Sequence, residues 1–262
     1  MRKGNFKRDL TAVCVSAGPY VGFSVLYAFS SFYVVFQNAT GFTNTQIGLL
    51  MSVLGIVSTI AYLPGGYIAD KFNPINTTVL GIVGCAIAAV FISTFPSFPI
   101  MLALYIIAPL FVVLIGWSAH LKVISLLGPE EEQGRLMSIR AVSRSGFGII
   151  TSLLGVLLLT MMDEATAFKF TLWIYIVVML VLALIAKICY KPVVSPKESE
   201  KFTLKDFIGV FKIKAVWLIA IMGCATYMAS AATVYLQPLL VSTFGISAAL
   251  STFLATVVKQ CA

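Results

Sequence analysis

The sequence alternates long apolar runs with short polar connections. Several runs hold 18 or more residues almost without charge, enough for an α-helix rising 1.5 Å per residue to cross about 30 Å of hydrocarbon. We therefore predict an all-α, polytopic membrane protein. The predicted spans are Leu10–Phe36, Thr45–Ala69, Ile75–Phe95, Pro99–Leu127, Leu136–Met162, Phe168–Tyr190, Ala215–Val241 and an eighth that begins near Ile246.

The composition supports this interpretation. Hydrophobic residues make up 60% of the chain, where about half is usual for a soluble domain. The first apolar run continues well past the length of a signal-peptide core and lacks a small-residue cleavage pattern, so we expect it to remain as an anchor. The five cysteines show no spacing typical of a zinc site or a disulfide framework. We expect no metal and no cofactor.

The positive charge is distributed unevenly between the connections. Sixteen of the eighteen lysines and arginines lie before the first span or around the connections after spans two, four and six. Positive charge between spans determines topology, which argues against a nucleic-acid partner. The positive-inside rule places the N-terminus and the connection between spans six and seven in the cytoplasm.

The longest polar stretch is residues 191–214. It contains two prolines and alternating lysine and glutamate, and then three apolar residues at helical spacing. This pattern predicts a linker that ends in an amphipathic helix on the cytoplasmic membrane surface. The three apolar residues are Phe207, Val210 and Phe211.

A glycine-rich turn joins the second and third spans. Its residues Gly66, Ile68, Asp70 and Lys71 resemble the first half of the loop signature of the major facilitator superfamily, Gly-x-Leu-x-Asp-Arg-x-Gly-Arg-Arg. The resemblance implies a twelve-span carrier that works by alternating access, with Asp70 in a cytoplasmic gate. The alternative is a solvated turn residue beside Lys71.

The second half of that signature is altered. Asn73 stands where the family has its second glycine, and Pro74 and Ile75 replace the basic pair. Asparagine tolerates the left-handed conformation, so we expect the turn to persist.

The turn between spans four and five carries a second resemblance. It runs from Gly128 to Gly134 and Arg135, and together with Trp117, Lys122 and Arg144-x-Gly146 it is similar to a bacterial subgroup of the superfamily. Some relatives in that subgroup carry sugar derivatives or organic anions. The resemblance places Gly134 and Arg135 with the cytoplasmic gate.

The fold implied by the resemblance has two similar halves. Residues 27–38 can be laid on residues 227–238 with four of 12 positions identical, a weak signal that falls where the fold requires it. Against twelve spans, this chain has about seven and a half. We therefore expect a truncated fold: a six-helix bundle over residues 1–190, the linker 191–214, and the incomplete start of a second bundle over residues 215–262.

Arg144 is the leading candidate for substrate binding. It lies nine residues beyond Arg135, roughly 13.5 Å deeper at helical rise, and half the hydrocarbon core is about 15 Å. Arginine near the midplane usually faces a bundle interior or an aqueous cavity. The alternative is that the fifth span starts later and that Arg140 and Arg144 extend to the interface. We favour such an interfacial position for Lys122, and a packing role for His120.

The predicted spans offer no acidic side chain for chemistry. All ten acidic residues lie in turns, linkers or helix ends, so no buried carboxylate is available to relay a proton or bind a cation. This favours an anionic or strongly polar solute. Neutral side chains on spans one and seven, which line the pathway in the family, complete the candidates or serve as inter-helix contacts: Tyr27, Ser30, Gln37, Tyr227, Ser230 and Gln237.

These observations predict a secondary carrier in a bacterial cytoplasmic membrane. Its expected partners are a small anionic or polar solute and the lipid bilayer. The alternative is a transport-incompetent fragment, or pseudogene-like product, of such a carrier. We do not expect an enzyme, because a single histidine and the absence of paired carboxylates, nucleophile sets and phosphate loops leave no acid–base inventory.

Overall fold

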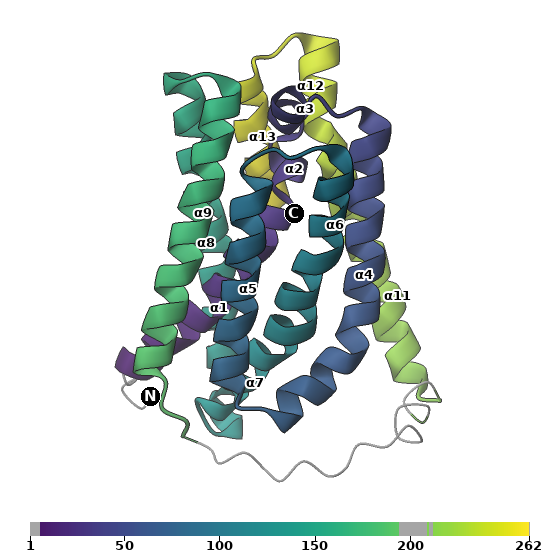
Figure 1. Ribbon diagram of the computed structural model, residues 1–262. Coiled ribbons are helices and arrows are strands. Elements are labelled where there is room, and N and C mark those ends of the chain that lie inside the picture. The colour runs from purple at the N-terminus through teal and green to yellow at the C-terminus, as the bar shows by residue number, and fades with distance from the viewer. Residues whose placement is uncertain (1–5, 194–208, 210–211, 262) are drawn as a thin grey trace.

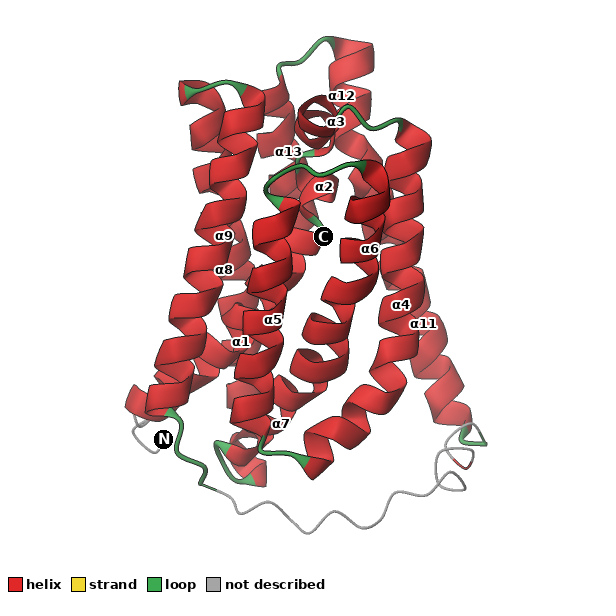
Figure 2. Cartoon of the chain, viewed as in Figure 1, coloured by secondary structure: helices red, strands yellow, loops and turns green. Residues whose placement is uncertain are grey.

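The computed structural model describes residues 6–193, 209 and 212–261. All regular elements in these ranges are helical (Figure 2). The helices are α1 (Phe6–Leu26), α2 (Ala28–Ser31), α3 (Tyr33–Thr40), α4 (Asn44–Lys71), α5 (Pro74–Ile92), α6 (Phe98–Pro109), η1 (Leu110–Trp117), α7 (Ser118–Leu126), η2 (Glu130–Glu132), α8 (Gln133–Met161), α9 (Glu164–Cys189), α11 (Lys214–Ala232), η3 (Thr233–Tyr235), α12 (Leu236–Phe244) and α13 (Ala248–Cys261).

The predicted spans one to six are confirmed as six helical segments long and apolar enough to cross a membrane, counted over the described ranges. The amphipathic helix predicted from Phe207, Val210 and Phe211 lies outside the described residues. Helix ends follow local capping rules. Thr43 and Gln46 form a capping box at the start of α4, and the left-handed Gly41 and Gly245 close α3 and α12.

The turn at Asn73 persists between α4 and α5, but the left-handed conformation considered for this residue is wrong. Its backbone is extended, with φ −62° and ψ 115°, and its side-chain oxygen accepts a hydrogen bond from the Asn76 backbone N–H at 3.4 Å. Asn73 therefore caps α5 and is not a left-handed turn residue. The reason is Pro74, which disfavours helical backbone in the residue before it and itself fits the first helical position.

Two of the predicted spans are broken. The first span bends at Tyr27 and Phe32, which separate α1, α2 and α3, and the seventh is interrupted by η3 between α11 and α12. Both breaks are followed by a short helix that ends at a left-handed glycine. The two segments therefore share a helix–break–helix form over the stretches that the sequence pairs at an offset of 200.

The fourth span contains a π-helical segment. Pro109 ends α6, and η1 continues the span before α7. η1 packs closely on α5, where a side chain on Gly81 would meet the backbone of Phe111 and Gly116 at 2.7–2.8 Å. A π-helical turn inside an α-helix often accompanies a functional site.

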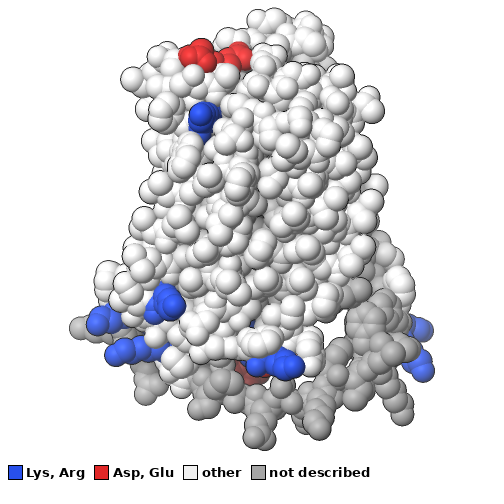
Figure 3. Space-filling model, in the orientation of Figure 1, with Lys and Arg blue, Asp and Glu red and all other residues white. Residues whose placement is uncertain are grey.

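The helices stand side by side in one elongated bundle (Figure 1). α1 packs against α8 and α9, α5 packs against α9 and η1, and α13 packs against α8. We call the end where α1 and α8 begin the basic end. On the face shown in Figure 3, charged side chains gather at the two ends, and the middle band carries none.

Candidate functional site

Arg140 and Arg144 lie on α8 where it meets α1 and α7. The Arg144 guanidinium carbon lies 4.9 Å from the ring centroid of Tyr20 on α1. The Arg140 Nε donates a hydrogen bond to His120 Nε2 on α7 at 3.4 Å. His120 is buried, whereas Arg144 is exposed. Three helices therefore converge on the two arginines.

An aromatic row continues from His120. The Trp117 ring lies 5.1 Å from the His120 ring and 5.4 Å from the ring of Phe23, between centroids. Phe23 lies on α1, three residues from Tyr20, which returns the row to Arg144. We name this set of side chains the central site: Tyr20, Phe23, Trp117, His120, Arg140 and Arg144. Tyr27 stacks on Phe23 at 4.8 Å, and Tyr62 of α4 contacts Trp117 at 6.5 Å.

The central site lies well along the bundle axis from the basic end. At the basic end Arg8 of α1 pairs with Glu132 at the start of α8, with the two atoms 2.6 Å apart. Tyr20 and Arg144 each lie 12 residues beyond that pair, which is about 18 Å at helical rise. The Arg8–Glu132 pair shows that α1 and α8 begin at the same height, and the Tyr20–Arg144 contact joins them again 12 residues later. Both helices therefore give the same distance from the basic end to the central site.

The two arginines have no acidic partner within the described chain. The ion pairs there all involve Arg8, Lys122 or Arg135. The described carboxylates lie at helix ends, as predicted: Asp9, Asp70, Glu130, Glu131, Glu132, Asp163 and Glu164. None of these described carboxylates thus neutralises the cationic side of the central site.

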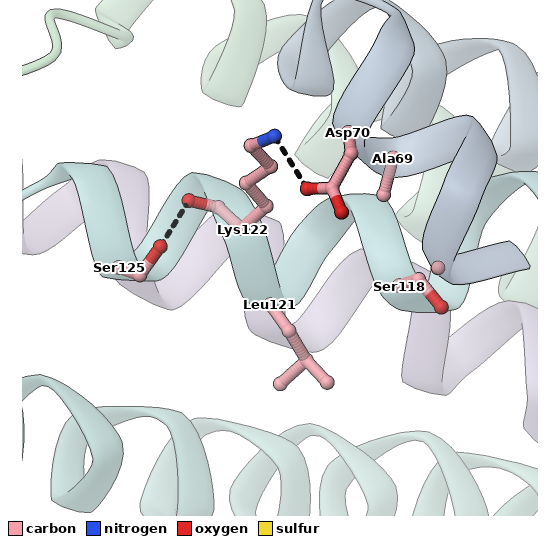
Figure 4. A pocket seen from close by; sticks show the side chains of 7 residues that line it. Ala69, Asp70, Ser118, Leu121, Lys122 and Ser125 are labelled. Atoms are coloured by element: carbon pink, nitrogen blue, oxygen red, sulfur yellow. Dashed lines mark hydrogen bonds and ion pairs between the residues drawn. The ribbon is translucent and has the colours of Figure 1, made fainter. Parts of the chain in front are cut away.

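The turn that carries the gate signature forms a separate groove at the basic end. Lys122 Nζ pairs with Asp70 Oδ1 at 2.6 Å, across a groove of about 410 Å³ (Figure 4). Lys71 instead lies near the rings of Tyr67 and Phe72, 5.8 and 6.0 Å from their centroids. The groove is lined by Gly66, Ala69, Asp70, Ser118, Leu121, Lys122 and Ser125.

The second predicted gate turn lies between α7 and α8 and forms ion pairs with the start of α1. Arg135 forms an ion pair with Asp9, and its other terminal nitrogen lies 3.8 Å from Glu132, which also pairs with Arg8. A Cβ added to Gly134 would meet no atom within 4 Å. These charges connect the starts of two helices, so the turn has a visible structural role at the basic end.

The neutral candidates are distributed along the broken spans. Ser30 is buried, and its hydroxyl donates to the Tyr27 carbonyl oxygen at 2.7 Å. Gln37 Nε2 donates to Asn44 Oδ1 at 2.9 Å. Both lie on α2 and α3, beyond the break that follows α1, whereas Tyr27 lies beside the central site. Tyr227 and Ser230 belong to α11, but their side chains lie outside the described part.

Gln237 connects three helices. Its side chain is fully buried, its Oε1 accepts from the Val34 backbone N–H at 3.3 Å, and its Nε2 donates to Thr252 Oγ1 at 2.6 Å. The break at Phe32 leaves first-turn N–H groups of α3 without intrahelical acceptors. Gln237 of α12 supplies an acceptor for one of these groups, the Val34 N–H.

Sequence reasoning did not assign Tyr20, Phe23 and Tyr62 to a site. Tyr20, Phe23 and Tyr27 lie at intervals of three and four residues, the spacing of one helical face. That spacing indicates that the three aromatic side chains lie on one face of the first span. No sequence pattern indicates Tyr62, because its partner Trp117 lies on another span.

The comparisons with known proteins decide the family. Residues 19–258 match the family model described as Major Facilitator Superfamily. The chain belongs to the major facilitator superfamily. This confirms the predicted membrane-carrier family, as opposed to an enzyme.

Two similar proteins come from Escherichia coli strain K12. Inner membrane protein YqcE is 26% identical over 272 residues, and inner membrane protein YihN is 25% identical over 233 residues. These matches cover 99% and 82% of this chain. The chain spans only 63% and 55% of the length of these relatives.

Solved structures of two transporters share the fold. A bacterial homologue of the human lysosomal transporter Spinster, in an inward-facing and unoccupied conformation, superposes with a TM-score of 0.70 at 15% identity. A POT family transporter in complex with a thioalcohol-conjugated peptide gives 0.56 at 17%. The matches cover 98% and 89% of this chain, but 60% and 50% of those proteins. At this identity they show the fold alone.

Proposed function

We propose that this chain is part of a secondary carrier that moves a small polar or anionic solute by alternating access. The observation that supports this most directly is the pair of arginines in the central site, which lack an acidic partner in the part of the chain described. Arg144 and Arg140 are one turn apart on α8, so their like charges oppose each other.

Electrostatics favours an anion at this position. An arginine at the centre of a membrane span costs about 2.5–3.5 kcal/mol on insertion scales, and no carboxylate among the described residues forms an ion pair with Arg140 or Arg144 to offset that cost. An oxyanion can accept hydrogen bonds from a guanidinium in the bidentate geometry that makes such contacts strong. A bound anion would reduce the net positive charge of the pair and the repulsion between its two members.

We also propose an organisation and an orientation. Residues 1–190 form one six-helix bundle, residues 191–214 link it to the next, and residues 215–262 begin the second. The basic end faces the cytoplasm of a bacterial inner membrane, as the positive-inside rule requires. In intact cells an impermeant thiol reagent should label Asn38→Cys and spare Lys71→Cys. The reverse pattern would invert the proposed orientation.

Uptake by cells tests the carrier proposal. The panel contains sugar acids, phosphorylated sugars and neutral sugars, offered to cells with this chain or with a version extended to the length of the E. coli relatives. We expect the extended version to take up an anion. Uptake by this chain itself would separate a carrier from a transport-incompetent fragment.

Arg144→Ala in the extended version should abolish that uptake. Lys187→Ala is the control, because it removes one exposed positive charge from the end of α9, away from the central site. If anion uptake survives Arg144→Ala, Arg144 is an interfacial side chain and the charge argument fails.

A further inference from the structure

We infer that the central site selects organic anions with a ring-shaped body: the anionic group binds Arg140 and Arg144, and the ring stacks on Trp117 and Phe23. This inference rests on the proposed function, because it names the class of solute that the same site takes. Three observations carry it, namely the arrangement of the contacts, the role of His120 and the exposure of the aromatic rings.

The six side chains of the central site come from α1, η1, α7 and α8 and form a circuit, in which four contacts are joined by two pairs of residues one helical turn apart. Arg144 lies over Tyr20, Phe23 follows on the same face of α1, Phe23 contacts Trp117, Trp117 contacts His120, and His120 binds Arg140. Charge occupies one side of this circuit, and rings occupy the other. A ligand that fits both sides has an anionic end joined to an apolar face.

His120 fixes the position of the cationic side. It is 2% exposed and accepts the Arg140 N–H through Nε2, so its own proton lies on Nδ1. An arginine has five N–H donors. The bond to His120 uses only the one on Nε and leaves the four on the terminal nitrogens for an anion. His120 is therefore a positioning residue.

The aromatic side is accessible. Trp117 and Phe23 are both half-buried, and Tyr62, which contacts Trp117, is 42% exposed. Binding pockets combine apolar and aromatic walls with a few placed polar groups. A small inorganic anion would contact the arginines and leave the rings uncovered. A linear anion would cover them poorly, whereas a ring presents a broader face to them.

Equilibrium binding to the purified chain tests this with two matched series. The carboxylates are hexanoate, cyclohexanecarboxylate and glucuronate, and the phosphate monoesters are butyl phosphate, phenyl phosphate and glucose 6-phosphate. In at least one series the ring compounds should bind about tenfold more tightly than the linear compound. Within each series, the affinities of the apolar-ring compound and the sugar are compared, which shows which kind of ring the site prefers. The same ratios are then measured as competition for uptake in the extended version.

Variants assign the preference to its residues. Trp117→Ala should reduce the ring compounds to the affinity of the linear anion, and His120→Ala should weaken all anions while the ring preference remains. Trp173→Ala is the matched control, because Trp173 is an exposed tryptophan on α9. It should change neither quantity.

Two failures are distinguishable. Equal binding of ring and linear anions, or a ring preference that survives Trp117→Ala, overturns this inference and leaves the anion carrier in place. Anion binding that is indifferent to Arg144→Ala overturns the proposed function itself.

Discussion

Asp163 illustrates how a single residue acts at a helix end. Its carboxylate accepts a hydrogen bond from the Thr166 backbone N–H at 2.9 Å and caps α9. Hydrogen bonds from the Thr166 backbone and side chain hold the pKa of Asp163 below its usual value. A carboxylate at a helix N-terminus is also favoured by the helix dipole.

This lowered pKa predicts a pH-dependent contribution to stability. A group with a lower pKa in the folded state stabilises above its unfolded pKa, and the contribution is lost as the pH falls through the folded value. The difference in melting temperature between the wild type and Asp163→Ala should therefore be present at neutral pH and shrink in acid. Asp163→Asn, which cannot titrate, should differ from Asp163→Ala by an amount independent of pH. A difference between the wild type and Asp163→Ala that grows in acid would contradict the capping role.

At the scale of elements, the close approach of α5 and η1 determines where Trp117 lies. A Cβ on Gly81 would meet backbone atoms of Phe111 and Gly116, which cannot move independently. A Cβ on Gly84 would instead meet the Phe111 ring. The missing side chains let the π-helical segment lie against α5 and bring Trp117 to the central site.

Gly81→Ala should therefore destabilise the protein by about 1–3 kcal/mol, the usual cost of overpacking. Thermal unfolding in detergent measures the loss. Gly48→Ala on α4 is the control, since nothing lies within 4 Å of its added Cβ, and alanine is the better helix former. Equal stability of the two variants would mean that α5 and η1 are less closely packed than described.

At the scale of the molecule, Gln237 connects the first broken span to the seventh and eighth. It joins α3, α12 and α13 through two hydrogen bonds, at the end of the bundle opposite the Asp70 groove. The two broken spans, which the sequence pairs as a weak repeat, thus also meet in space.

Gln237→Ala should free the Val34 N–H and increase the hydrogen exchange of α3. A buried donor left without an acceptor costs about 1–3 kcal/mol, so a modest loss of stability should accompany it. Gln133→Ala is the control. Gln133 donates to the carbonyl oxygens of Ser125 and Gly128 at the basic end, and its loss should leave exchange in α3 unchanged. Unchanged exchange in Gln237→Ala would argue against the connection.

The sequence by itself determined where the six long apolar helical segments lie, but not the breaks within them. The length of the apolar runs gives the spans. The constant rise of a helix converts the nine residues between Arg135 and Arg144 into a separation of roughly 13.5 Å along the axis. Capping also depends on neighbours in sequence, as the Asp163 cap illustrates. The same local rules explain Asn73, because Pro74 beside it excludes the expected conformation.

Only the tertiary structure decided the partners. Asp70 pairs with Lys122, 52 residues away, and Gln237 binds the Val34 backbone N–H, 203 residues away. The central site draws on α1, α7 and α8 together with Trp117 at the end of η1. A hydrophobic period shows which face of a helix is buried, but it does not show which other helix covers that face. Helix packing fixes those pairs, because it brings together residues whose order in the chain carries no information about their contact.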